Sequence, residues 1–132
     1  MSDGDVSDRY EKGIAIMREI GSDPNGPKGY RKLDPVVGPA LDRMLGEFCF
    51  GDVWAREALD LRTRRVITLT ALAAQGKERA MPGHIKGALN QGFSRQEILE
   101  IFVQMIPYVG FPATLAAIEV ATNVFAELDK QS

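Results

Sequence analysis

The single histidine of the chain, His84, is the clearest candidate for acid–base chemistry. Imidazole is the one side chain whose ordinary pKa allows proton exchange near neutral pH. Helical spacing places His84 on an apolar stripe that faces packed protein, formed by Met81, His84, Ile85, Ala88 and Leu89. A hydrogen-bonded core histidine fits this pattern as well as a catalytic one.

The segment from Glu47 to Arg65 combines carboxylates, a thiol, a tryptophan and four arginines. Guanidinium groups form paired hydrogen bonds with carboxylates, so this segment is a candidate site for a carboxylated substrate. Solvated arginines paired with Glu57 and Asp60 are the structural alternative. The arginines are Arg56, Arg62, Arg64 and Arg65. Trp54 either lines a pocket or anchors the local turn.

Asp52 and Cys49 are weaker candidates. Asp52 follows Gly51 in a predicted turn, where a structural aspartate is as common as a catalytic one. Cys49 lies between two phenylalanines and fits a small core residue better than a nucleophile. A lone cysteine allows no internal disulfide and no CxxC motif, and one histidine with scattered carboxylates gives no metal-ligand spacing. We therefore expect no metal and no cofactor.

Length and charge narrow the class of protein. A chain of 132 residues suits a single domain over 1–132, and a formal charge of −2 gives no reason to expect nucleic acid or an anionic membrane as a partner. The N-terminal sequence is polar, and the apolar run 66–74 is about half a membrane span. We expect a cytoplasmic protein that acts on a small molecule.

The chain before residue 34 is predicted to be one amphipathic helix and a loop. The helix opens at Asp8 and stops at Gly21. The following segment, 22–33, is rich in proline and glycine, and a flexible lid is one possible role for it.

The helical core is predicted to cover about 34–128 with five more helices. Asp34 caps a helix that ends at Gly51, with an inward face of Val37, Leu41, Met44, Leu45 and Phe48. Asp60 caps the next helix, which has little polar surface beyond Arg65 and should be buried nearly all round. Of the last three helices, the first contains His84 and the second follows a Ser94–Glu97 capping box. The third begins at Pro112.

Six amphipathic helices without a strand imply an all-α, six-helix bundle. The apolar area of the last helices is large for a monomer of this size, so we expect a homo-oligomer. A well-filled monomer core is the alternative.

Five stretches of the chain, in this order, resemble the carboxymuconolactone decarboxylase family, whose fold is shared with the alkylhydroperoxidase D proteins. The resemblance implies a trimer or hexamer with active sites near subunit contacts. The stretches are Arg9–Ile20, Phe50–Arg56, Leu59–Ala74, Gly83–Ile101 and Tyr108–Ala117.

The resemblance also distinguishes two branches of that family. The peroxidase-like branch uses a CxxC pair and a glutamate; these positions read Lys77, Ala80 and Arg65, so dithiol chemistry is excluded. The decarboxylase branch keeps the histidine and an aromatic-Gly-Glu-Val-Trp-x-Arg segment. Here that segment has Phe50 for the usual tryptophan and Asp52 for the usual glutamate.

The implied reaction is decarboxylation of 4-carboxymuconolactone or a related carboxylated lactone, in the catabolism of aromatic compounds. His84 would move the proton or hydrogen-bond the enolate oxygen, and Arg56, Arg62 and Arg65 would bind carboxylates. Asp52 would orient His84 or a water, and Trp54 would contact substrate. Pro82 at the start of a helix would place His84 in the first turn, where the positive helix end disfavours imidazolium. A non-catalytic or ligand-binding oligomer, or an enzyme for another cyclic substrate, are the alternatives.

Overall fold

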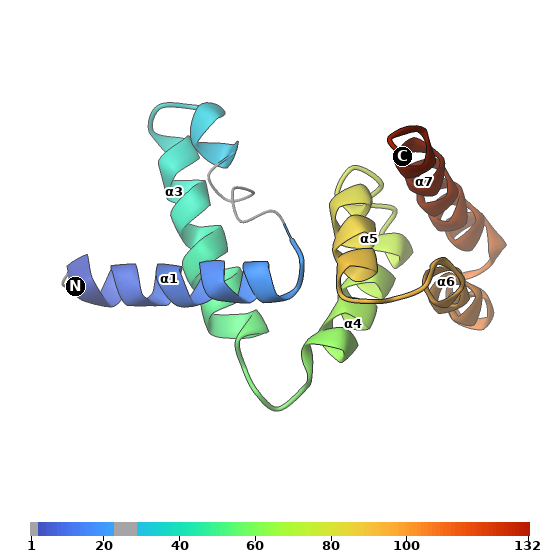
Figure 1. Cartoon of the computed structure of the whole chain (residues 1–132), viewed down its shortest axis with the longest axis horizontal. Helices are drawn as coiled ribbons and strands as arrows, with labels where there is room; N and C mark the ends of the chain where they lie inside the picture. The colour runs from blue at the N-terminus through green and yellow to red at the C-terminus, as the bar shows by residue number, and fades with distance from the viewer. Residues whose placement is uncertain (1–2, 23–28) are drawn as a thin grey trace. The chain divides into compact units, whose positions relative to one another are not determined.

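The computed structural model describes residues 3–22 and 29–132, and all regular elements in these ranges are helical (Figure 1). They comprise six α-helices, one 3-10 turn and one π-helix, which confirms the all-α prediction. The chain divides into two compact units, Met1–Leu61 and Arg62–Ser132, called unit 1 and unit 2. A single domain over 1–132 stays a prediction.

Unit 1 is built around the contact between α1 (Asp3–Glu19) and the π-helix η2 (Leu45–Trp54). Glycines make this contact close: a Cβ on Gly13 would lie 2.8 Å from the carbonyl carbon of Gly46. The remaining elements are η1 (Tyr30–Lys32) and α3 (Val37–Met44), which pack on each other. The core of the unit consists of Ile14, Met17, Ile20, Phe50 and Trp54.

The helix boundaries of unit 1 differ from the prediction at two places. α1 begins at Asp3 rather than at Asp8, although it stops before Gly21, whose φ is +70°. Gly51 does not end the second helix, since the chain continues as η2 to Trp54. The missing side chain of Gly51 instead lets the backbone of Arg9 in α1 approach closely. Residues 23–28, half of the predicted loop 22–33, lie outside the described residues, so a lid there stays a prediction.

The N-cap residue of α3 is Val36 rather than the predicted Asp34, but Asp34 lies just before it and binds the start of the helix. The Asp34 side chain accepts hydrogen bonds from the backbone N–H groups of Val36 and Val37, at 2.8 and 2.7 Å. These two bonds satisfy donors that a helix start leaves unpaired. The backbone hydrogen bonds to Asp34 also lower the pKa of its carboxyl group below the usual range.

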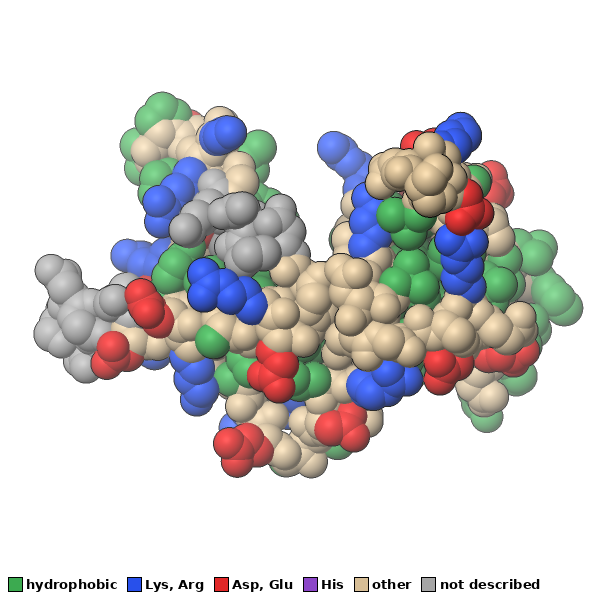
Figure 2. Space-filling view, viewed as in Figure 1, with side chains coloured by type: hydrophobic (Ala, Val, Ile, Leu, Met, Phe, Trp, Pro, Cys, Tyr) green, Lys and Arg blue, Asp and Glu red, His purple; other side chains and the backbone are tan. Residues whose placement is uncertain are grey.

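The predicted inward face of α3 is largely exposed, which is a correction. Val37, Leu41, Met44 and Phe48 are each more than a third exposed within the single chain. Figure 2 shows hydrophobic side chains at the surface around α3. Helix α1 packs on η2, and among the described residues of unit 1 none covers these exposed side chains. We call Val37, Leu41, Met44 and Phe48 the α3 apolar face.

Unit 2 contains α4 (Leu61–Ala74), α5 (Met81–Asn90), α6 (Arg95–Val109) and α7 (Phe111–Lys130). α4 is not buried all round: Arg65, Leu69 and Ala73 are buried, whereas Ile67 is half exposed. A single face of α4 therefore meets the core. The buried core residues of the unit are Leu69, Ala73, Met81, Ile85, Ala88, Phe93, Ile98, Phe102, Met105, Ala117, Ala121, Val124 and Phe125.

The predicted start of α6 is confirmed. The backbone N–H of Glu97 donates to Ser94 Oγ at 3.0 Å, and the backbone N–H of Ser94 donates to Glu97 Oε1 at 2.8 Å. This capping box fixes the turn between α5 and α6. Gly110, with φ of +86°, then separates α6 from α7.

Helix α7 is long and apolar enough to cross a membrane, judged by length and composition alone. In this structure it packs against α5 and α6 and buries Ala117, Ala121 and Val124, among others. Only 28% of its apolar window is buried in this structure, and a single helix of this kind is weak evidence for a membrane span.

Candidate functional site

His84 lies near the N-terminus of α5. The helix begins at Met81 with Pro82 in its first turn, as predicted, so His84 is its fourth residue. Met81, Ile85 and Ala88 are fully buried, and His84 is half-buried on the same stripe. The imidazole ring of His84 therefore packs against the protein and stays partly exposed.

Arg65 of α4 is the hydrogen-bond partner of His84. Its Nη1 lies 2.7 Å from His84 Nδ1, and its Nε donates to Gln91 Oε1, also at 2.7 Å. The arginine side chain is 0% exposed. Gly87 makes room for it, because a Cβ at that position would lie 2.8 Å from Arg65 Cζ.

The charge state of this pair follows from its burial. Burial, and then the charge of Arg65, lower the pKa of His84 to about 4. Burial lowers the pKa of Arg65 to about 10, which still leaves the guanidinium protonated at neutral pH. The site therefore combines a neutral imidazole with a buried cation.

Arg62, one turn before Arg65 on α4, adds a second cation. Its Nη1 donates to the backbone carbonyl of Gln91 at 3.2 Å, and its Nη2 lies 3.5 Å from Glu97 Oε2. The guanidinium also lies over the Phe93 ring, 3.9 Å from its centroid. Arg62 is about half exposed, so it can reach a ligand in solvent. The structure thus joins two predicted site residues, His84 and Arg65, by a hydrogen bond, and Arg62 shares Gln91 with this pair.

The other predicted site residues belong to unit 1. Asp52 accepts two hydrogen bonds from Arg9, at 2.6 and 3.3 Å, on the surface. Trp54 is buried and stacks on Phe50 with ring centroids 5.8 Å apart. Arg56 is exposed just after η2. Their predicted roles beside His84 and the substrate stay predictions.

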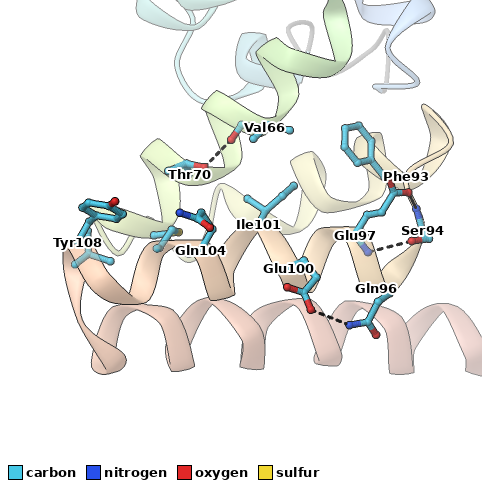
Figure 3. A pocket seen from close by; sticks show the side chains of 12 residues that line it. Val66, Thr70, Phe93, Ser94, Gln96, Glu97, Glu100, Ile101, Gln104 and Tyr108 are labelled. Carbon is cyan, nitrogen blue, oxygen red and sulfur yellow. Dashed lines mark hydrogen bonds between the residues drawn. The ribbon is translucent and has the colours of Figure 1, made fainter.

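A cavity of about 740 Å³ opens on unit 2 between residues of α4 and α6 (Figure 3). Its lining includes Val66, Ile101 and Tyr108, and neither His84 nor Arg65 belongs to it. The carboxylates of Glu97 and Glu100 also line it and would repel an anionic ligand. This cavity is therefore a poor site for a carboxylated substrate.

Cys49 and metal ligands contribute little to a site. Burial raises the pKa of the Cys49 thiol, which favours the unreactive protonated form. In residues 3–22 and 29–132 there is no group of three or more histidine, cysteine, aspartate or glutamate side chains arranged to hold a metal ion.

Two residues of the site, Gly87 and Gln91, were not identified from the sequence. Together with His84 they follow i, i+3, i+7 spacing, which places all three on one face of α5. Counting this spacing forward from His84 would have found them. The predicted stripe instead followed the apolar residues, and it therefore missed the polar edge that receives Arg65.

Comparisons with known proteins agree with the decarboxylase resemblance. The sequence model of the carboxymuconolactone decarboxylase family matches residues 39–123, which include parts of both units. The chain is 28% identical over 120 residues to a 4-carboxymuconolactone decarboxylase of Acinetobacter baylyi, covering 91% of this chain and 89% of that protein.

Two further relatives are more diverse. An uncharacterized 15.0 kDa protein of Paracoccus denitrificans is 35% identical over 103 residues, with 76% of each chain covered. The nitrosuccinic acid decarboxylase of Metarhizium robertsii is 24% identical over 119 residues, covering 90% of this chain and 82% of that protein.

Proposed function

The chain belongs to the carboxymuconolactone decarboxylase family, and we propose that it removes carbon dioxide from 4-carboxymuconolactone or a related carboxylated small molecule. The observation that carries this proposal is the contact between the neutral His84 ring and the buried Arg65 cation. Such a pair offers positive charge for an anionic substrate and an uncharged ring for the reacting group.

The reaction breaks the bond between the substrate and its carboxylate. The electron pair left behind moves into a conjugated carbonyl as an enolate, and the product carbon takes up a proton. Positive charge from Arg62 and Arg65 favours both the bound carboxylate and the enolate. His84 acts on the enolate, by moving a proton or by hydrogen bonding to its oxygen. As the family resemblance implies, Asp52 is proposed to orient His84 or a water, and Trp54 and Arg56 to contact the substrate.

The names of two relatives suggest the breadth of the substrate class. One acts on a carboxylated lactone and the other on nitrosuccinic acid, so both substrates place a carboxylate near a group that can accept electrons. We therefore include acyclic acids with a nitro or carbonyl acceptor among the candidate substrates. No cofactor is part of the proposal, because such a substrate carries its own electron acceptor.

Turnover of purified protein tests the function. We expect carbon dioxide release and loss of the substrate chromophore with 4-carboxymuconolactone, and nitrosuccinate serves as the second substrate. His84→Gln should lower kcat by about 10² to 10⁴, the usual loss for a proton-transferring group. Lys86→Ala, an exposed change on the same helix, should leave kcat unchanged. Absence of turnover with both substrates, or full activity of His84→Gln, would contradict the proposal.

We also propose that the protein is a cytoplasmic homo-oligomer, a trimer or hexamer. The α3 apolar face supports this, because a second copy could cover side chains that the single chain leaves in water. Light scattering of the purified protein should give three or six times the chain mass. Met44→Glu should lower that mass, whereas Glu119→Gln, an exposed change on α7, should not.

A further inference from the structure

The contact between Arg65 and His84 has a fixed hydrogen-bond direction. A guanidinium group has five N–H donors and no acceptor, and Arg65 keeps its proton at neutral pH. At 2.7 Å, its Nη1–H therefore donates to His84 Nδ1, which must carry a lone pair. Neutral imidazole has one N–H, so the remaining proton lies on Nε2.

The position of Arg65 is set by three features of α5. Gln91 accepts a hydrogen bond from Arg65 Nε, and Gly87 leaves the space that the guanidinium fills. His84 itself receives the third contact. Since the arginine is fully buried, these contacts hold the donor in one place.

We propose that Arg65 is a positioning residue that holds His84 in the neutral tautomer with the proton on Nε2, so that the ring donates a hydrogen bond to the enolate oxygen. This inference rests on the proposed decarboxylation and chooses between the two roles given there for His84. A neutral imidazole can polarise an oxygen in this way without becoming charged. Arg65 thereby acts through His84 and is not the carboxylate ligand expected from the sequence; Arg62, which reaches solvent, keeps that role.

If His84 donates a hydrogen bond to the enolate oxygen, the proton that the product carbon takes up must come from another group. The carbon–carbon bond breaks, carbon dioxide leaves, and the electron pair passes through the conjugated system to the oxygen that Nε2–H contacts. Because Nε2–H is hydrogen-bonded to the enolate oxygen, the ring keeps this proton and does not deliver it to the product carbon. Water protonates the product carbon instead, and the hydroxide that remains combines with carbon dioxide to give bicarbonate.

Nitrogen NMR of the full-length, untagged protein labelled with ¹⁵N-histidine tests the tautomer directly. The single histidine gives two ring nitrogen signals. Between pH 6 and 8 we expect the Nδ1 signal of an unprotonated nitrogen and the Nε2 signal of a protonated one. A protonated Nδ1, or an imidazolium in this range, would overturn the inference, and this measurement requires no variant.

Substitutions at Arg65 then test whether this residue sets the tautomer of His84. Arg65→Lys keeps a donor and should keep Nδ1 unprotonated. Arg65→Glu replaces the donor with an acceptor and should move the proton to Nδ1, with the ring titrating at higher pH than in the unchanged protein. Arg95→Lys is the matched control, because Arg95 pairs with Asp129 on the surface and should leave both ring signals unchanged. An unprotonated Nδ1 in folded Arg65→Glu would contradict the role of Arg65.

The two proposals fail in different ways. The expected tautomer without turnover would contradict the proposed function, whereas turnover with a protonated Nδ1 would contradict the inference about Arg65. Turnover together with an unprotonated Nδ1 and a protonated Nε2 would support both.

Discussion

Each unit of the protein has a hydrogen-bonded group around a buried charged side chain, Asp42 in unit 1 and Arg65 in unit 2, but the two groups are built from different partners. In unit 1, Asp42 is 1% exposed, accepts a hydrogen bond from Tyr10 at 2.8 Å and forms an ion pair with Arg31. In unit 2, Arg65 is 0% exposed, and its guanidinium forms hydrogen bonds with the imidazole of His84 and the amide of Gln91, among its contacts.

The pKa shifts show the consequence of this difference. In unit 1, burial and the hydrogen bond to Asp42 raise the pKa of Tyr10 to about 12, so the phenol stays a neutral donor beside a paired carboxylate. In unit 2, burial lowers the pKa values of both Arg65 and His84, which shows that desolvation exceeds the stabilisation of their charged forms. A buried charge kept under such a penalty is more typical of a functional site than of a structural ion pair.

The packing around the two groups differs as well. Gly13 in unit 1 faces backbone atoms of η2, which cannot move without unfolding the contact. Gly87 in unit 2 faces the end of the Arg65 side chain. The first of these contacts is rigid, whereas the second can yield by displacing the guanidinium.

The largest effect on stability is expected for Gly13→Ala. Its Cβ would overlap the backbone of Gly46, and we expect a loss of more than about 3 kcal/mol in the free energy of unfolding. Gly29→Ala is the control, because a Cβ there would meet no atom within 4 Å. Urea denaturation of the unchanged protein, Gly13→Ala and Gly29→Ala measures the difference. Equal midpoints would show that the contact at Gly13 is no more rigid than the contact at Gly87.

Acid should weaken unit 2 through His84. The folded-state pKa is about 4 against an ordinary 6.5, so this contribution is fully present above pH 6.5 and is lost as the pH falls toward 4. A shift of this size corresponds to about 3 kcal/mol. We expect unfolding free energies measured from pH 7 to pH 4 to fall less steeply for His84→Gln than for the unchanged protein. Parallel curves would show that His84 is not buried as a neutral ring.

Substitution of Asp42 in unit 1 and of Arg65 in unit 2 compares the two hydrogen-bonded groups directly. Asp42→Ala should cost about 2 kcal/mol, because Tyr10 and Arg31 lose a charged partner. Arg65→Met should cost less than about 1 kcal/mol, since the lost hydrogen bonds are offset by the removed desolvation penalty. The same Arg65→Met change should abolish most turnover, which Asp42→Ala should not do at temperatures where it stays folded. Thermal unfolding and kcat measured on both variants test this opposition.

The smallest effect is expected for two alanines on α5. Gly83→Ala meets nothing within 4 Å and should stabilise the protein by about 0.5 to 1 kcal/mol through helix propensity. Gly87→Ala gains the same propensity but displaces Arg65, so we expect a net loss of about 1 kcal/mol. A stabilising Gly87→Ala with an unchanged His84 titration would show that the guanidinium does not need this space.

Much of unit 2 could be predicted because its signals are local. The Ser94–Glu97 capping box and the Gly110–Phe111–Pro112 break each depend on a few neighbouring residues, and both helix starts are confirmed. The place of His84 in the first turn of α5 followed in the same way from Pro82. Two of the predicted site residues, Arg65 and His84, lie on helices α4 and α5, both of which were predicted.

The failures come from features that only packing decides. Gly51 was interpreted as a helix stop, but its lack of a side chain serves the close approach of Arg9 instead. The α3 apolar face obeys helical spacing, yet periodicity indicates which residues share a face and not what covers it. Arg65 looked like a ligand for substrate because its type and position gave no sign of the space left by Gly87.

The stacked pair of Phe50 and Trp54 gives unit 1 an optical label of its own. Trp54 is the one tryptophan of the chain and is buried in the core of that unit, so its emission reports the unfolding of that core. Circular dichroism follows the helices of both units. Superimposable melting curves from the two signals would show one cooperative transition and support a single domain, whereas separate curves would show that the two units melt independently.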